Sequence, residues 1–382
     1  MKNFSWVIIF IFLHIGSANS QDEHLEYIQN NYAPPGEYLN SLFKKNDLVI
    51  ICEREHPELT QYDFFFEIVS QDWFVEKVGT VICEIASRSI QSKIDSVLFA
   101  ENLAENELDA LLVDINLNMS HHEFWPHKNF YNFLKSIYYL NQNIKQDKKI
   151  RLLGADIPID WEELRTKEDR REYEKQYFPS RDRYMAEFIM DWYKKDTCKK
   201  AMIIMNTRHA FMNYSYKADE NEKRKEGKST RILNNVGAFI RHELPEKSTN
   251  VMLNNFTWNR TFKFRQRIAG GKWDKSFYLN NNHPCGLSLK NSPFGNDDFD
   301  YFPYASTNLK WNDVFDHLIF YNPLCDFISS SGVNGLIDKR IEDEILRRYN
   351  VNNNFKPFFT QQKIRKLNTE NMSQYRFKRY CK

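Results

Sequence analysis

Residues 47–56 read DLVIICEREH, a continuous apolar run that ends abruptly in charged residues. A run this short, rich in branched aliphatic side chains, is typical of a strand that is buried on both faces. Such strands belong to parallel sheets that helices cover on both sides. Glu53 and His56 follow the run, so the sequence predicts that they stand at the carboxyl end of a buried strand.

Five further runs of the same kind occur along the chain, at residues 80–83, 150–153, 201–205, 251–253 and 317–321. Apolar residues at helical spacing lie between them, at residues 64–73, 90–98, 130–137, 185–192 and 232–240. This alternation predicts an α/β fold: a mainly parallel sheet covered by helices on both faces, with helical and loop insertions.

Composition excludes several classes of protein. The 382 residues are 42% hydrophobic and 27% charged, which indicates a folded globular chain. Lys and Arg number 53 against 51 Asp and Glu, so the net charge of +2 offers no long-range attraction to a nucleic acid, and none is expected as a partner. The six cysteines contain no C-x-x-C pair and no dense framework; Cys285 with Cys325 is one conceivable disulfide.

The N-terminus has the pattern of a secretory signal. Lys2 precedes an apolar run over residues 4–15, which gives way to small residues up to Ser20. We expect residues 1–20 to be removed after Ser20, with an uncleaved anchor as the alternative. Gln21 stands where a lipoprotein needs cysteine, so we expect a secreted or periplasmic protein with no stable membrane anchor.

The rest of the chain shows no clear domain boundary. Residues 21–362 are expected to form one α/β domain with insertions, and residues 363–382 a basic, solvated tail. Residues 165–176 are densely charged and predict a solvated helix, whereas residues 217–231 have no apolar face and predict a mobile loop.

Ionisable residues stand after four of the predicted strands. Glu53 and His56 follow the first, Glu84 ends the second, Asp156 follows the third and His209 the fourth. The carboxyl ends of parallel strands meet at one edge of a sheet, where ligands bind. Each residue alone could cap a helix, organise a turn or be a buried structural histidine. Their coincidence predicts a functional site at this edge.

Two further features adjoin this predicted site. Arg181 precedes the helix predicted at residues 185–192, and we expect it to pair with the acidic residues of the site or, with Asp156, to bind an anionic or polar substrate group. A salt bridge of Arg181 with Asp182 or Glu187 at the start of the helix is the structural alternative. Residues 121–127 read HHEFWPH, in which a proline would interrupt the helix that an H-E-x-x-H zinc motif requires. This segment predicts a loop that could cover the pocket.

The predicted site is suited to hydrolysis. A neutral His56 can take a proton from water, Glu53 or Glu84 can orient the imidazole, and His209 or Arg181 can stabilise an oxyanion. The chain has no G-x-S-x-G motif, which argues against an ordinary serine hydrolase. The same groups suit Zn²⁺ or Mn²⁺, but no local ligand spacing supports a metal, so we favour activation of water without a metal or other cofactor.

The segment Glu53-Arg54-Glu55-His56 after a strand resembles the Gly-Glu-x-x-His segment of the erythromycin esterase-like family. The strand that carries Glu84 is similar to the second, glutamate-bearing strand of that family. Residues 181–187 (RDRYMAE) and the strand that leads to His209 are similar to its Arg-x-x-x-Met-Ala-Glu helix and following strand. The similarity spans residues 47–211, with a weaker echo at residues 315–320.

This resemblance implies an esterase or lactonase acting on a small molecule. The wider superfamily also includes haem-binding ChaN-like lipoproteins and TIKI-type metalloproteases, so a haem or iron carrier and a metal-dependent hydrolase are the alternative functions. Two residues depart from the family pattern. Cys52 replaces the usual glycine, and we expect it to fill space against Cys83. Asn206 replaces an additional histidine of many esterases in the group, which puts the antibiotic-esterase reaction itself in question.

Overall fold

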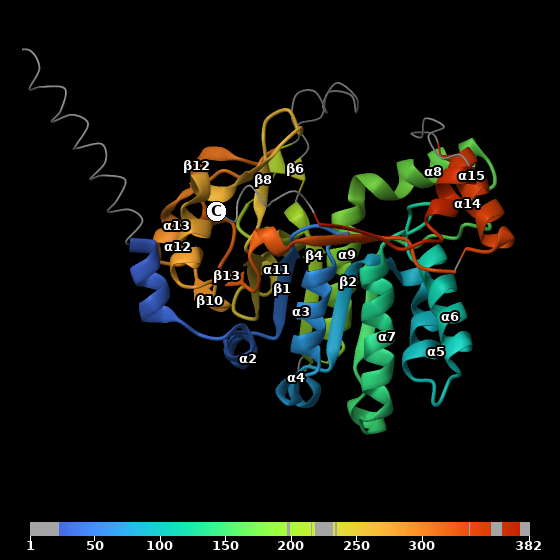
Figure 1. The fold of residues 1–382 in the computed structure, drawn as a ribbon, viewed down its shortest axis with the longest axis horizontal. Helices are drawn as coiled ribbons and strands as arrows, with labels where there is room; N and C mark the ends of the chain where they lie inside the picture. Colours follow the sequence, from blue (N-terminus) through green and yellow to red (C-terminus); the bar gives the residue numbers. More distant parts are fainter. Residues whose placement is uncertain are drawn as a thin grey trace, which may run out of the picture.

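The computed structural model describes residues 23–196, 199–214, 216–217, 232–233, 235–335, 337–352 and 361–374. Its centre is a seven-stranded sheet with the order β10-β13-β7-β1-β4-β2-β3 (Figure 1). The strands are β1 (Leu48–Glu53), β2 (Thr80–Ser87), β3 (Arg151–Asp156), β4 (Ala201–Asn206), β7 (Ser248–Leu253), β10 (Cys285–Ser288) and β13 (His317–Phe320). All pairs are parallel except β10 with β13, so the predicted α/β fold is confirmed.

The six apolar runs are the six parallel strands. The strand β1 lies at the centre, with Leu48 opposite Ala201 of β4 and Ser248 of β7, and all its residues are buried. The antiparallel edge strand β10 was not predicted, because its sequence CGLS contains no β-branched residue. Its Gly286 lies against the ring of Tyr38, where a side chain would not fit.

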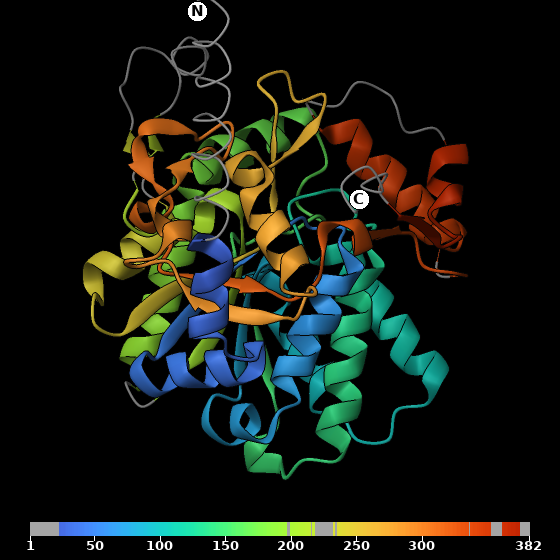
Figure 2. The ribbon, with the colours of Figure 1, turned by 60° about the vertical axis from the view of Figure 1, so that its left-hand side comes forward.

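Helices cover both faces of the sheet (Figures 1 and 2). The larger core packs one face against α2 (Pro35–Lys45), α3 (Leu59–Val69), α4 (Asp72–Lys77), α5 (Gln91–Leu98), α6 (Glu105–Asn118) and α7 (Lys128–Gln142). Two further helices, α14 (Lys339–Val351) and α15 (Gln361–Lys366), extend this core beyond the sheet and contact each other, and α14 also contacts α8 (Lys167–Tyr177). The other face packs against α9 (Arg181–Lys194), α11 (Val236–Glu243), α12 (Lys272–Leu279) and α13 (Pro293–Asn296). One expected helix is shorter than predicted, because residues 232–233 form a strand and α11 begins only at Val236.

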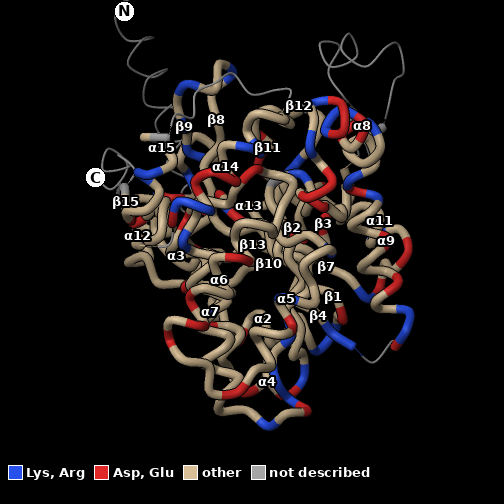
Figure 3. Tube along the Cα trace, turned by 90° about the vertical axis from the view of Figure 1, so that its right-hand side faces the viewer, with Lys and Arg blue, Asp and Glu red and all other residues tan. Residues whose placement is uncertain are grey.

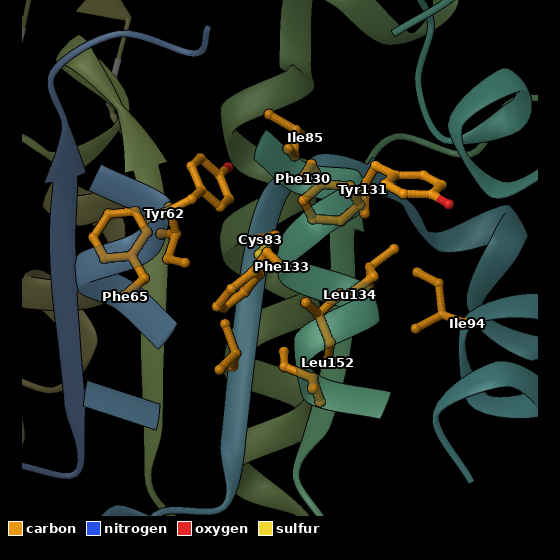
Figure 4. Close-up of a cluster of buried hydrophobic side chains, with 14 of the residues drawn as sticks. Tyr62, Phe65, Cys83, Ile85, Ile94, Phe130, Tyr131, Phe133, Leu134 and Leu152 are labelled. Atoms are coloured by element: carbon orange, nitrogen blue, oxygen red, sulfur yellow. The ribbon is translucent and has the colours of Figure 1, made fainter. Parts of the chain in front are cut away.

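Aromatic side chains fill the larger core beneath the site. Figure 4 shows Tyr62 and Phe65 of α3 beside Phe130 and Phe133 of α7, close to Cys83 of β2. The Tyr62 ring meets the Phe133 ring edge-on, with the centroids 5.5 Å apart. This packing fixes α3 against α7 and so holds the buried Tyr62 below the carboxyl end of β1.

The cysteines do not lie as expected. Cys52 and Cys83 belong to the cores on opposite faces of the sheet, and β4 separates their strands, so Cys52 does not pack against Cys83. Cys285 and Cys325 are both free thiols, so the conceivable disulfide between them is wrong. Cys285 is instead an apolar member of the second core.

The charged insertion forms α8 (Lys167–Tyr177), which confirms the predicted helix. Its N-terminus is fixed by a capping box between Thr166 and Asp169. One side of it is not solvated, however, because Arg170 and Tyr173 are buried against neighbouring aromatic residues. The predicted signal peptide and residues 218–231 of the predicted loop lie outside the described residues.

The described part of the basic C-terminal segment packs onto the body. Ile364 in α15 is fully buried in the larger core. The strand β15 (Asn371–Gln374) pairs antiparallel with β14 (Ile328–Ser331). The described residues of this segment are therefore attached to the body through Ile364 and through strand pairing, while most of their side chains are exposed. Among the residues described, no helix has both the length and the apolar character that a membrane crossing requires.

Gly154 on β3 gives a test of this packing. An added Cβ would lie 2.6 Å from the carbonyl oxygen of Ala86 and 2.7 Å from that of Ser87, both backbone atoms. We expect Gly154→Ala to lower the free energy of unfolding by about 1–3 kcal/mol, measured by urea denaturation. Gly36→Ala is the control, because its Cβ would meet nothing closer than 3.8 Å. Equal stabilities of the two variants would contradict the packing described here.

Candidate functional site

A cavity of about 260 Å³ opens where β1, β2, β3 and β4 end. Its walls come from the loops that follow these strands, from the start of α9 and from two more distant loops. The lining residues are His56, Glu84, Ile85, Ser120, His121, His122, Trp125, Asp156, Arg181, Asn206, Arg208, His209 and Tyr304. Five of the six predicted site residues are among them, and the sixth, Glu53, lies directly behind His56.

His56 and Glu53 form a close pair at the end of β1, in which Glu53 is buried and the His56 side chain is 30% exposed. The Nδ1 atom of His56 lies 2.8 Å from Oε2 of Glu53, and Tyr62 donates a 2.7 Å hydrogen bond to Oε1 of Glu53. Burial by itself lowers the pKa of His56, but the neighbouring Glu53 carboxylate outweighs burial and raises this pKa above its ordinary value. The Glu53 carboxylate is therefore the charged partner of the ring on its Nδ1 side, and His56 lines the cavity.

Glu84 lies at the centre of the site. Its Oε2 accepts a 2.7 Å hydrogen bond from the backbone N–H of Asn206, while Oε1 lies 3.2 Å from Arg181 Nη2 and 3.3 Å from His209 Nε2. Burial alone raises the pKa of this carboxyl, but His209, Arg181 and more distantly His56 outweigh it, so the pKa is lowered. Glu84 was predicted to end its strand. In fact β2 continues to Ser87, with an irregular register after Cys83.

Asp156, the last residue of β3, holds two other members of the site. Its Oδ1 accepts a 2.6 Å hydrogen bond from Arg181 Nε, and its Oδ2 lies 3.1 Å from His121 Nδ1. Against the effect of burial, Arg181 and His121 keep the pKa of Asp156 well below its usual range. Arg181 thus pairs with two acidic residues of the site, Asp156 and Glu84, which was one of the expectations. The structural alternatives pair with other arginines, Asp182 with Arg208 and Glu187 with Arg183.

His209 is enclosed between carboxylates. Its Nδ1 lies 2.8 Å from Asp182 Oδ2, and its Nε2 faces Glu84. Arg208 Nη1 donates to both oxygens of Asp182 at 3.0 Å. Despite burial, His209 and Arg208 lower the pKa of Asp182 to about 2. Since both ring nitrogens are engaged, His209 is placed to hold Glu84 in position and has no free nitrogen to act as a base.

The segment HHEFWPH is a loop at the cavity, as predicted. His121, His122 and Trp125 line the cavity, and Phe124 and Trp125 are buried. The Trp125 ring lies 5.1 Å from that of His56 and meets it edge-on. This loop therefore forms one wall beside the His56 ring. His121, oriented by Asp156, brings a second imidazole to the same space.

Sequence reasoning missed several residues of the site. Asp182 had a signal, because it lies next to Arg181 at the start of a helix, but it was read only as a possible partner of Arg181. Ser120 had no signal of its own, since it lies just before the loop predicted at residues 121–127. Tyr304 had no signal at all, since it comes from an irregular segment nearly one hundred residues after β4.

The site does not form an obvious metal centre. Among the residues that the structure describes, no group of three or more histidine, cysteine, aspartate and glutamate side chains is arranged to hold a metal ion. Glu84 and Asp156 are instead directed at Arg181 and at histidines. The arrangement suits proton transfer by oriented imidazoles and binding of a polar group.

Comparison with known proteins supports the fold and identifies no family. No family model matches the chain, and no curated protein matches it. A solved succinoglycan biosynthesis protein is similar in structure, with a TM-score of 0.50 and 12% identity over 78% of this chain and 96% of that one. At this identity the likeness shows the α/β fold alone.

Two other solved structures match more loosely. A Bacillus cereus protein has a TM-score of 0.49 at 12% identity, covering 78% of this chain and 96% of its own. The haem-binding ChaN of Campylobacter jejuni has a TM-score of 0.32 at 14% identity, covering 57% of this chain and 85% of its own.

The buried carboxylates predict a loss of stability in acid. A lowered pKa means that the contribution of Asp182 is present above its unfolded pKa, near 4, and is lost as the pH falls towards about 2. We expect Asp182→Asn to be about 2 kcal/mol less stable than wild type at pH 7. Urea denaturation should show this difference shrinking as the pH falls from 4 towards 2.

Asp343→Asn, on the exposed side of α14, is the matched control and should follow the wild-type curve at each pH. A constant difference between wild type and Asp182→Asn down to pH 2 would contradict this assignment.

Proposed function

We propose that this protein is a hydrolase that uses His56 to activate water for attack on an ester. The observation that carries the proposal is the oriented pair of His56 and Glu53, with Tyr62 holding the second oxygen of the carboxylate. A histidine whose Nδ1 faces a buried carboxylate and whose Nε2 is free is the common arrangement of a general base. It stands in the wall of a cavity that already contains cationic groups.

The reaction needs no protein nucleophile. His56 Nε2 removes a proton from water as the water oxygen bonds to the acyl carbon, and Glu53 stabilises the resulting imidazolium. The tetrahedral intermediate then collapses, the bond to the alkoxy oxygen breaks, and His56 returns its proton to that oxygen. The products are a carboxylic acid and an alcohol, or one hydroxy acid when the substrate is a lactone.

Arg181 is placed to bind the acyl oxygen. It lines the cavity, and Asp156 holds it in position before a substrate arrives. Donors that are already oriented stabilise a developing negative charge with little reorganisation. Glu84 and His209, which we named as candidate catalytic residues, are positioning residues in this mechanism, because they hold Arg181 and one another.

The substrate class rests on the resemblance to erythromycin esterase-like proteins, which suggests esters or lactones of small molecules. The cavity of about 260 Å³ is large enough for the reacting part of such a substrate. If the leader at residues 1–20 is removed as expected, the reaction takes place outside the cytoplasm.

The first test is a screen of esters and lactones with His56→Gln and Glu53→Gln. We expect His56→Gln to lower kcat/KM by about 10²–10⁴-fold, and Glu53→Gln to lower it less, because the base remains but loses its orientation. His242→Gln is the control, since His242 is highly exposed on α11. Full activity in a folded His56→Gln variant would exclude the mechanism. A haem Soret band on titration, without turnover, would favour a haem carrier.

The second test is the pH dependence of hydrolysis. His56 must be neutral to accept a proton, so the rate should rise with pH through the raised pKa of His56. Removing the Glu53 charge lowers that pKa, so Glu53→Gln should shift the rising limb to lower pH while reducing its plateau. The plot of log kcat/KM against pH measures both. An unshifted limb would mean that another group is the base.

A further inference from the structure

A short hairpin projects from the molecule beyond the carboxyl end of β7 (Figures 1 and 3). It consists of β8 (Phe256–Trp258) and β9 (Arg265–Arg267), which pair antiparallel. Residues 259–264, which we call the hairpin tip, join the two strands. None of the steps in the proposed hydrolysis uses the hairpin tip.

The hairpin tip presents two phenyl rings to solvent. The exposed fractions of Phe262 and Phe264 are 56% and 68%, among the highest of the large hydrophobic side chains described. Phe262 also has a φ of 53°, a left-handed conformation that is unfavourable for a bulky residue. A strained residue that is also an exposed phenyl ring is costly to a soluble protein unless the ring has a partner.

Hydrogen bonds hold the hairpin tip in this shape. The Asn259 side-chain oxygen accepts from the backbone N–H groups of Lys263 and Phe264, each at 2.9 Å. The backbone N–H of Asn259 donates to the carbonyl of Phe264 at 2.8 Å. The Phe262 ring also lies 4.9 Å from that of Phe302. A hydrogen-bonded turn therefore holds the two rings at the surface. Little further ordering of the hairpin tip is needed when the rings bind a partner.

The charge of the hairpin is of one sign. Residues 258–267 read WNRTFKFRQR, with four basic residues and no acidic one. Arg265 is paired with Glu55 and lies over the Phe256 ring, whereas Arg260 and Lys263 are exposed beside the two phenyl rings. Phenyl rings flanked by exposed cations are complementary to a bilayer surface, which has negatively charged headgroups at its boundary with water and apolar acyl chains beneath them.

We propose that the hairpin tip docks the protein onto an anionic lipid surface. The phenyl rings of Phe262 and Phe264 enter the boundary of the acyl chains, and Arg260 and Lys263 contact the headgroups. A tip of six residues is too small for a stable protein interface, which needs about 800 Å² from each partner. Insertion of two rings into a bilayer has no such requirement.

Docking at this hairpin would also place the cavity near the lipid. Phe302, which contacts Phe262, is two residues from Tyr304 in the cavity wall. The docking proposal does not depend on the proposed hydrolysis, because vesicle binding is measured without turnover.

The test is cosedimentation of the full chain with vesicles of phosphatidylcholine, alone or mixed with phosphatidylglycerol. We expect binding to the mixed vesicles, weak binding to phosphatidylcholine alone, and loss of binding as salt is raised. In the double variant Phe262→Gly with Phe264→Ser, affinity should fall at least tenfold. Glycine accepts the φ of residue 262 without strain, so this variant should remain folded.

Charge and location are tested with two more variants. Arg260→Glu with Lys263→Glu should remove the preference for phosphatidylglycerol. Tyr278→Ser with Leu279→Ser, at two exposed hydrophobic residues of α12, should bind like wild type. All variants carry the same N-terminal segment, so any binding by that segment cancels in the comparison. Absence of wild-type binding, equal binding to both vesicle types, or unchanged binding by the phenylalanine variant would each overturn the proposal.

Discussion

The structure of the site depends on one chain of largely buried side chains in which carboxylates alternate with arginines and histidines. The chain runs from Arg208 through Asp182, His209, Glu84, Arg181 and Asp156 to His121, with each member 2.6–3.3 Å from the next. Its members come from β2, β3, the turn after β4, the start of α9 and the loop at residues 121–127. These segments are distant in sequence, and each supplies a partner for the polar side chain of the next.

Burial of such a chain costs free energy unless every member has its partners. A buried carboxylate loses its hydration, and the loss is offset only when close partners satisfy its oxygens. Glu84 meets this requirement with three donors, one of which is the backbone N–H of Asn206. The chain therefore favours one arrangement of the loops over others, which matters more for a site than the modest net stability that buried ion pairs contribute. His56 and Glu53 lie beside this chain and keep a free nitrogen.

The parts of this arrangement that the sequence predicted follow from local rules. Short apolar runs identified the parallel strands, and the position of a residue after such a run placed Glu53, His56, Asp156 and His209 at one edge. The order of the strands is a long-range property, so the separation of Cys52 from Cys83 by β4 could not be foreseen. The same limit applies to Tyr304, whose position depends on the packing of whole segments. The attachment of the C-terminal segment was not predicted, because composition does not show pairing such as that of β15 with β14.

The four residues of the segment Glu53-Arg54-Glu55-His56 have different structural roles. Arg54 is fully buried, donates to Glu58 at 2.9 Å and reaches the carbonyl of Asn322 at 3.2 Å, after β13. Glu55 faces outward to Arg265 of β9. The two residues between the glutamate and the histidine thus fasten the turn on the side away from the cavity. This leaves His56 to face the cavity from a turn that is fixed on both sides, so its orientation is set by the fold as well as by Glu53.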